Sequence, residues 1–298
     1  MIDRRQFIAG LAASSAMGQV SAAPLLRRVI PSSGEAIPAV GMGTWLTFDV
    51  GDNAHQLRVR QQVLEAFFEG GGSLIDSSPM YGTSEATLGR CLDSFEDKPT
   101  LFAATKVWTP GRWLGIKQMK NSAALWRMPR LDLMQIHNLL DWKSHLPTLK
   151  SWKSEGRFRY IGITTSHGRR HREIAELLRT EPLDFVQLTY NLLDREAEQQ
   201  LIPIAMERGI AVIANRPFQG SRLFDRVRNA PLPGWAKEIQ CTNWAQVFLK
   251  FILSHRGVTC AIPATSRVDH MLENIGALHG ELPDPRLRRR ILDDYLHI

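Results

Sequence analysis

Four polar side chains end, or closely follow, short apolar runs in the first half of the chain. Asp76 ends Ser-Leu-Ile-Asp, Tyr81 stands five residues later, Lys106 ends Leu-Phe-Ala-Ala-Thr-Lys, and His137 ends Leu-Met-Gln-Ile-His. A buried lysine lowers the pKa of a neighbouring phenol, and a carboxylate paired with that lysine makes its buried charge tolerable. Asp76, Lys106 and Tyr81 could therefore form one acid unit, and His137 could hold a carbonyl oxygen beside it.

Each of these residues also has a structural explanation when it is taken alone. Asp76 could cap the following helix, Lys106 could be a surface charge at a strand end, Tyr81 could pack at a rim, and His137 could be a core histidine. The sequence holds no zinc-binding set such as His-Glu-x-x-His, so no metal site is expected. A joint function depends on the elements that position the four side chains.

Those elements alternate regularly from residue 39 onward, because short β-branched runs are followed by longer segments of helical period. The strands are expected at 39–45, 73–77, 101–107, 131–137, 160–164, 184–190, 210–215 and 258–263. This alternation predicts a single-domain (β/α)₈ TIM barrel, whose active site is built at the C-terminal ends of the strands. Residues 24–38, centred on Ser33-Gly34, predict a short hairpin that caps the N-terminal end of the barrel.

The N-terminal segment has a separate character. Residues 1–22 contain Arg4-Arg5-Gln-Phe-Ile, a mildly apolar run and small residues up to Ala22, and they resemble a twin-arginine signal peptide. This resemblance implies a barrel domain over 23–298, the twin-arginine export machinery as a partner, and a periplasmic location. The alternative is an N-terminal extension of a cytoplasmic enzyme.

Composition excludes several other classes of protein. The formal net charge is +7, but the arginines and lysines are scattered, so binding of nucleic acid is not expected. No apolar stretch reaches the roughly 20 residues that cross a bilayer, so stable membrane insertion is not expected either. Cys91, Cys241 and Cys260 lack the spacing of a disulfide framework or a metal site and are expected in the core.

A longer motif surrounds the first two polar residues. The stretch 71–89 reads Gly-Gly-Ser-Leu-Ile-Asp-Ser-Ser-Pro-Met-Tyr-Gly-Thr-Ser-Glu-Ala-Thr-Leu-Gly. It resembles the signature of the aldo-keto reductase superfamily, in which Asp and Tyr lie five residues apart before Glu-x-x-Leu-Gly. The resemblance continues at 40–45, 105–106, 136–137, 162–164, 262–266 and 273–274, and so spans nearly the whole predicted barrel.

This resemblance assigns a role to each of the four residues. It implies that Tyr81 donates a proton to the substrate carbonyl, Lys106 lowers the pKa of Tyr81, Asp76 pairs with Lys106, and His137 orients the oxygen. It further implies an oxidoreductase that transfers hydride from NAD(P)H to an aldehyde, ketone or sugar carbonyl. The alternative is a module that binds the nicotinamide cofactor, or senses redox state, without turnover.

The cofactor contacts implied by the resemblance depart from the family pattern at two positions. Thr164-Thr165 stands where the family commonly has Ser-Asn, and Asn215 stands where many members stack an aromatic ring on the nicotinamide. Gln187 keeps its family position. The full set of expected cofactor contacts is Thr164, Thr165, Gln187, Arg216, Phe218, Thr265, Ser266, Arg267, His270 and Asn274.

The choice of cofactor and the substrate pocket rest on a few more residues. Arg267 and His270 could bind a 2′-phosphate, which favours NADP, although NAD is possible and Arg267 could be a simple surface charge. Trp45 and Trp108 are expected to line the substrate pocket. The short segment 138–145 after His137 suggests that this pocket is open.

Overall fold

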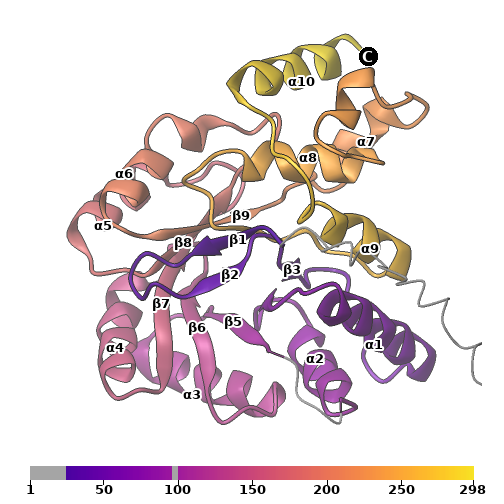
Figure 1. Ribbon diagram of the computed structural model, residues 1–298. Helices are drawn as coiled ribbons and strands as arrows, with labels where there is room; N and C mark the ends of the chain where they lie inside the picture. The colour runs from indigo at the N-terminus through magenta and orange to yellow at the C-terminus, as the bar shows by residue number, and fades with distance from the viewer. Residues whose placement is uncertain (1–24, 96–99) are drawn as a thin grey trace, which may run out of the picture.

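A barrel of parallel strands forms the centre of the molecule (Figure 1). The computed structural model describes residues 25–95 and 100–298. Eight strands pair in chain order, β3 through β10. They are β3 Met42–Gly43, β4 Leu74–Asp76, β5 Phe102–Val107, β6 Leu131–Ile136, β7 Phe158–Thr164, β8 Phe185–Thr189, β9 Ala211–Asn215 and β10 Cys260–Ala261. Bridges from Val40 to Ala261 and from Gly43 to Ala264 join the first strand region to the last, so the expected (β/α)₈ fold is confirmed.

Every expected strand is present, and the two that meet at the closure are the ones most shortened relative to their expected ranges. β3 covers two residues of the range 39–45, and β10 covers two of 258–263. The other strands are almost wholly buried apolar runs, as in parallel sheets covered on both faces. His137 does not end β6 but begins the short 3₁₀ helix η1, His137–Leu139.

A hairpin fills the N-terminal end of the barrel. Strands β1, Arg27–Val29, and β2, Ala36–Pro38, pair antiparallel, and Gly34 in the turn between them has a φ of 77°. Ile30 and Ile37 pack on residues that begin barrel strands, such as Phe102 and Phe185. The expected hairpin cap is therefore confirmed, and the pocket can open only at the opposite mouth.

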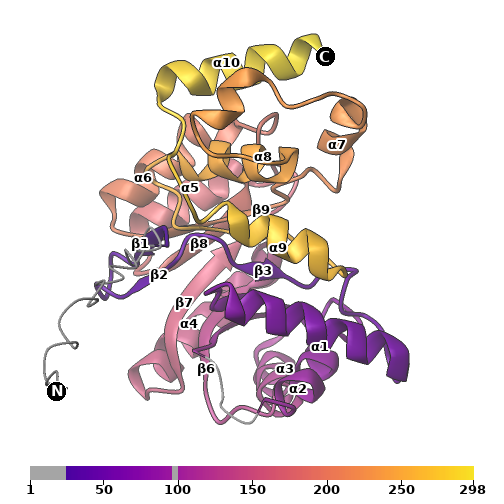
Figure 2. The same ribbon diagram turned by 45° about the vertical axis from the view of Figure 1, so that its right-hand side comes forward.

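Ten α-helices surround the strands within the described part of the chain. They are α1 Ala54–Glu69, α2 Ser84–Leu92, α3 Arg112–Leu125, α4 Trp142–Ser154, α5 His171–Thr180, α6 Leu201–Glu207, α7 Arg222–Val227, α8 Trp244–Leu253, α9 Val268–Gly276 and α10 Pro285–His297. Helices α1 and α9 lie side by side. Helices α7, α8 and α10 lie together at the top of the view in Figure 2, around a separate apolar cluster.

The glycine that ends the 71–89 motif has a packing explanation. A Cβ at Gly89 in α2 would lie 1.9 Å from the carbonyl oxygen of Leu125, so α2 can approach the end of α3 only with glycine there. Cys91, Cys241 and Cys260 are buried free thiols, as expected. Among residues 25–95 and 100–298, no helix is long and apolar enough to cross a membrane.

Candidate active site

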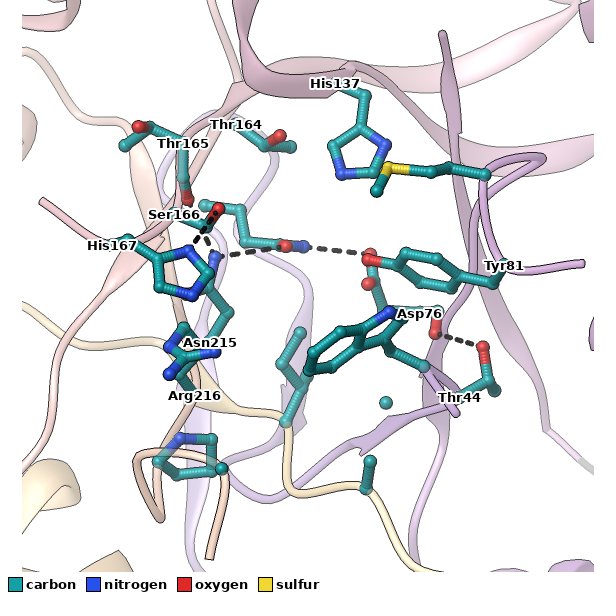
Figure 3. A pocket seen from close by; sticks show the side chains of 18 of the residues that line it. Thr44, Asp76, Tyr81, His137, Thr164, Thr165, Ser166, His167, Asn215 and Arg216 are labelled. Carbon is teal, nitrogen blue, oxygen red and sulfur yellow. Dashed lines mark hydrogen bonds between the residues drawn. The ribbon is translucent and has the colours of Figure 1, made fainter. Parts of the chain in front are cut away.

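A cavity of about 200 Å³ opens at the C-terminal ends of the strands, and three of the four predicted catalytic residues line it. Asp76 comes from the end of β4, Tyr81 from the loop before α2, and His137 from the start of η1. Lys106, on β5, is fully buried behind them. The barrel therefore brings the four side chains to one mouth. Tyr81 and His137 lie across the cavity from Thr165, Ser166 and Asn215 (Figure 3).

The carboxylate of Asp76 binds three side chains. Lys106 Nζ donates to Asp76 Oδ2 at 2.6 Å, and the amides of Gln135 and Gln187 donate to Oδ1 at 3.0 and 2.9 Å. Lys106 also donates to the carbonyl oxygen of Ser77 at 2.7 Å. Burial disfavours the charge on Lys106, but Asp76 and Tyr81 outweigh burial and raise its pKa above the usual value. Lys106 is thus a fixed cation beneath the cavity.

Tyr81 lies close to this cation. Lys106 Nζ is 5.0 Å from the centre of the Tyr81 ring. Burial raises the pKa of Tyr81, and the positive charge of Lys106 opposes this rise without cancelling it. Lys106 therefore has the expected lowering effect, but burial of the phenol is the larger effect, so the pKa of Tyr81 stays above its usual value and the free protein keeps Tyr81 protonated.

His137 is held in place by a residue that the sequence reasoning missed. Its Nδ1 lies 2.9 Å from Ser78 Oγ, and its ring meets the Tyr81 ring edge-on at 5.7 Å. Burial, together with the charge of Lys106, lowers the pKa of His137 to about 3, so its imidazole is neutral at ordinary pH. A neutral imidazole carries one N–H and can donate one hydrogen bond to a substrate oxygen.

Half of the predicted cofactor contacts line the same cavity. They are Thr164, Thr165, Gln187, Arg216 and Phe218. In this structure the Gln187 amide is already bonded to Asp76, and Thr165 Oγ1 donates to the carbonyl oxygen of Arg169 at 2.6 Å. The polar groups on this wall suit an amide such as that of nicotinamide.

Asn215 also lines the cavity and is the centre of a small network. It accepts a hydrogen bond from Thr189 Oγ1 at 2.7 Å and donates to the carbonyl oxygen of Thr165 at 2.8 Å. A weaker contact of 3.4 Å joins its amide to Gln187 Oε1. Its departure from the family pattern was visible in the sequence, but the network depends on tertiary neighbours that the sequence did not reveal.

The other predicted cofactor contacts lie apart from the cavity. Thr265, Ser266, Arg267, His270 and Asn274 follow β10 or belong to α9, and none is part of the cavity lining. Thr265 and Asn274 are buried. Exposed Arg267 is bound by Asp269, with 2.9 Å between Nε and Oδ1. An extended dinucleotide could reach from the cavity to this second group, where the N–H groups that begin α9 suit a phosphate.

The two tryptophans expected at the substrate pocket have different positions. Trp45 lines the cavity together with Met80, and both are about 43% exposed. Trp108 is not part of the lining, and its ring centre lies 6.5 Å from that of His137. Trp108 is held at the rim by Gln118, which accepts from its backbone N–H and donates to its carbonyl oxygen. A substrate would meet Trp45 inside the cavity and Trp108 at its edge.

The chain is similar to known proteins both in sequence and in structure. The family model described as "Aldo/keto reductase family" matches residues 39–289. Methylglyoxal reductase YeaE of Escherichia coli is 27% identical over 88% of this chain and 93% of its own length. An NADH-specific methylglyoxal reductase of Escherichia coli is 29% identical over 82% and 91%. An aldo/keto reductase from Klebsiella pneumoniae, solved with NADP and acetate, superimposes with a TM-score of 0.73 at 24% identity, over 90% and 95% of the two chains.

Proposed function

The chain belongs to the aldo/keto reductase family, and we propose that it reduces small 2-oxoaldehydes such as methylglyoxal with NADPH. It is an oxidoreductase that transfers hydride from a reduced nicotinamide to a carbonyl group. The main observation behind this proposal is that Tyr81 and His137 line the same cavity, and that the ion pair with Asp76 fixes Lys106 behind them. A cofactor-binding module without turnover would not need this proton-donating group.

The chain's own residues supply the proton and the electrostatic part of the reaction. The bound nicotinamide supplies the hydride. Tyr81 Oη is the proton donor for the carbonyl oxygen, and the neutral imidazole of His137 holds that oxygen by a hydrogen bond. The cation of Lys106 stabilises the phenolate that remains on Tyr81, and Asp76 fixes that cation. No metal is needed for this chemistry, because the developing negative charge is met by preorganised donors.

The substrate class follows from the size and lining of the cavity. A space of about 200 Å³, which the nicotinamide ring would share, leaves room for only a small carbonyl compound. Trp45 and Met80 give it an apolar side, and Asn138 and Ser166 give polar groups. A 2-oxoaldehyde is small and has a second oxygen for those polar groups. The names of two relatives, both methylglyoxal reductases, support the same class.

The test is turnover by purified protein with a matched loss-of-acid variant. Methylglyoxal should give a higher kcat/KM than a simple aliphatic aldehyde, a ketone or an aldose. Tyr81→Phe keeps the ring but removes the proton donor, so reduction should fall by at least about 10²-fold while NADPH still binds. Fluorescence titration with NADPH measures the binding separately. Turnover by Tyr81→Phe close to that of the native protein would refute the assigned role, and binding without turnover in the native protein would favour the sensing alternative.

The preference for NADPH depends on an arginine that has an acidic neighbour. Arg267 is the residue expected to bind the 2′-phosphate, and Asp269 competes for its guanidinium. The pair is exposed and therefore weak, so a phosphate can displace the carboxylate. Asp269→Asn should tighten NADPH about two- to fivefold and leave NADH unchanged. Arg267→Ala is the matched control and should weaken NADPH alone. Equal effects on both cofactors in these variants would contradict the proposal.

Export is proposed from the sequence, and its segment lies outside the described residues. Arg4 and Arg5 stand before an enzyme whose cofactor is made in the cytoplasm, and the twin-arginine route carries folded proteins. A chain that folds first can take its cofactor across the membrane. Replacing both arginines by lysine should keep the protein in the cytoplasm, and native protein from the periplasm should purify with nicotinamide bound. Native protein found wholly in the cytoplasm would overturn the export proposal.

A further inference from the structure

The hydroxyl of Ser78 lies between two groups of the active site. Its Oγ is 2.9 Å from Nδ1 of His137 and accepts a hydrogen bond from the backbone N–H of Met80 at 3.2 Å. Ser78 is fully buried, in the loop that connects β4 to Tyr81. The family comparisons give Ser78 no role, and the reaction outlined above does not use it directly.

The direction of the hydrogen bond between Ser78 and His137 follows from counting donors and acceptors. A serine hydroxyl has one hydrogen and two lone pairs, and a neutral imidazole has one N–H and one bare nitrogen. If His137 carried its proton on Nδ1, Ser78 Oγ would accept from both His137 and Met80. The Ser78 hydrogen would then be left without an acceptor among the described residues, although the Ser78 side chain is fully buried.

The opposite direction satisfies both Ser78 Oγ and Nδ1 of His137. Ser78 donates its hydrogen to Nδ1 of His137 and accepts from Met80, which leaves the single imidazole proton on Nε2. An unpaired buried donor is costly, so the equilibrium between the two tautomers should favour this arrangement by about fivefold or more. Doubly protonated His137 would orphan the Ser78 hydrogen in the same way.

The remaining nitrogen of His137 is accessible from the cavity. His137 lines the cavity, and its Nε2 makes no hydrogen bond to a described residue. Nε2 is also absent from the side-chain atoms of the described chain that are both buried and without a partner. Since Nδ1 points at Ser78, Nε2 lies on the ring edge that is free to meet a ligand.

We propose that Ser78 is a positioning residue that keeps the proton of His137 on Nε2, where it donates a hydrogen bond to the substrate oxygen beside Tyr81. The tautomer itself is a property of the free protein, whereas its use in turnover rests on the proposed carbonyl reduction. The fully buried cation of Lys106 acts in the same sense, because it disfavours a second proton on His137.

The direct test is the imidazole spectrum of the native enzyme. In ¹⁵N-histidine-labelled protein, long-range ¹H–¹⁵N correlation should show His137 with an unprotonated Nδ1 and a protonated Nε2 at pH 7. A His137→Asn sample identifies its signals among those of the nine histidines. A protonated Nδ1 in the native enzyme would overturn the proposal, whatever the activity.

Two variants test the use of this tautomer in catalysis. Ser78→Ala removes the donor and should lower kcat about tenfold, with NADPH affinity unchanged and with Nδ1 protonation appearing in the spectrum. Ser78→Thr keeps the hydroxyl and should restore both kcat and the native His137 signals.

Ser122→Ala is the matched control, because Ser122 is equally buried and loses a hydrogen bond to Glu85 outside the cavity. It should leave kcat and the His137 spectrum unchanged. If Ser78→Ala lowers kcat while the His137 signals stay native, the positioning role is wrong. If the tautomer is as proposed but no carbonyl compound is reduced, the proposed function fails and the assignment of the tautomer stands.

Discussion

Replacement of Lys106 by methionine tests whether the buried ion pair between Lys106 and Asp76 supports both the stability of the fold and the activity of the site. Lys106 Nζ and Asp76 Oδ2 are 2.6 Å apart, and the two side chains are 0% and 2% exposed. Methionine has similar length and no charge, so Lys106→Met leaves the carboxylate of Asp76 buried without its cation. The variant should lose both activity and stability.

The size of the loss follows from what still contacts Asp76. Removal of one partner from a buried pair costs about 3–5 kcal/mol of unfolding free energy. Gln135 and Gln187 continue to donate to Asp76 Oδ1, so the cost should lie near the lower end of that range. The double variant Asp76→Asn with Lys106→Met removes both charges and keeps an acceptor for the two amides. It should recover at least about half of the lost stability.

The dependence on pH separates a stranded charge from a packing defect. In the native protein the pKa of Lys106 is raised above 10.5, so its contribution is fully present below that value and is lost only above it. In Lys106→Met the carboxyl group can shed its charge by taking up a proton, which is easier at low pH. Urea unfolding should therefore show a smaller loss at pH 5 than at pH 9. An equal loss at both pH values, or no rescue in the double variant, would refute this reasoning.

Three further predictions concern single residues. Asn215→Tyr places an aromatic ring on the cavity wall, so the affinity for NADPH should rise by up to about tenfold in a fluorescence titration. Weaker binding of NADPH would show that the hydrogen bonds of Asn215 matter more than stacking. Lys250 in α8 is fully buried, and its ammonium group donates a hydrogen bond to the carbonyl oxygen of Ile239. Burial lowers the pKa of Lys250, because it disfavours the charged form. Lys250→Met should therefore raise the melting midpoint by about 2–4 °C in calorimetry. The pKa of His137 is lowered to about 3, so His137 should not titrate near pH 6.5. A plot of kcat/KM for reduction against pH should therefore contain no change near pH 6.5 that is caused by His137. Such a change, present in the native protein and absent in His137→Asn, would contradict this prediction.

Much of the fold could be predicted from the sequence because a parallel barrel imposes a regular pattern. Each strand is buried on both faces and therefore reads as an apolar run, and each helix that follows has its own period. The ends of the strands were less predictable. The bridges at Val40 and Gly43 continue the barrel where regular pairing has stopped, and the turn into η1 begins at His137 instead of after it.

The site could be predicted as far as residue type and strand position decide it. Asp76, Tyr81, Lys106 and His137 all lie at, or just after, the C-terminal ends of strands at one mouth, so the topology alone brings them together. The residues that orient them could not be found in this way. Ser78 faces Nδ1 of His137 across 59 positions of sequence, and nothing in the local sequence of either residue indicates the pairing.

The cavity wall at Asn215 and the carboxylate of Asp76 belong to one hydrogen-bond network, and Gln187 is the residue that joins them. Its Nε2 donates to Asp76 Oδ1 at 2.9 Å, and its Oε1 receives the weaker contact from Asn215. An amide that binds on both sides has a fixed orientation, because a flip would place Nε2 against the Asn215 amide and Oε1 against the Asp76 carboxylate. Asn215 therefore affects how Asp76, and through it Lys106, is held. The contact from Asn215 therefore contributes to a defined orientation of Gln187.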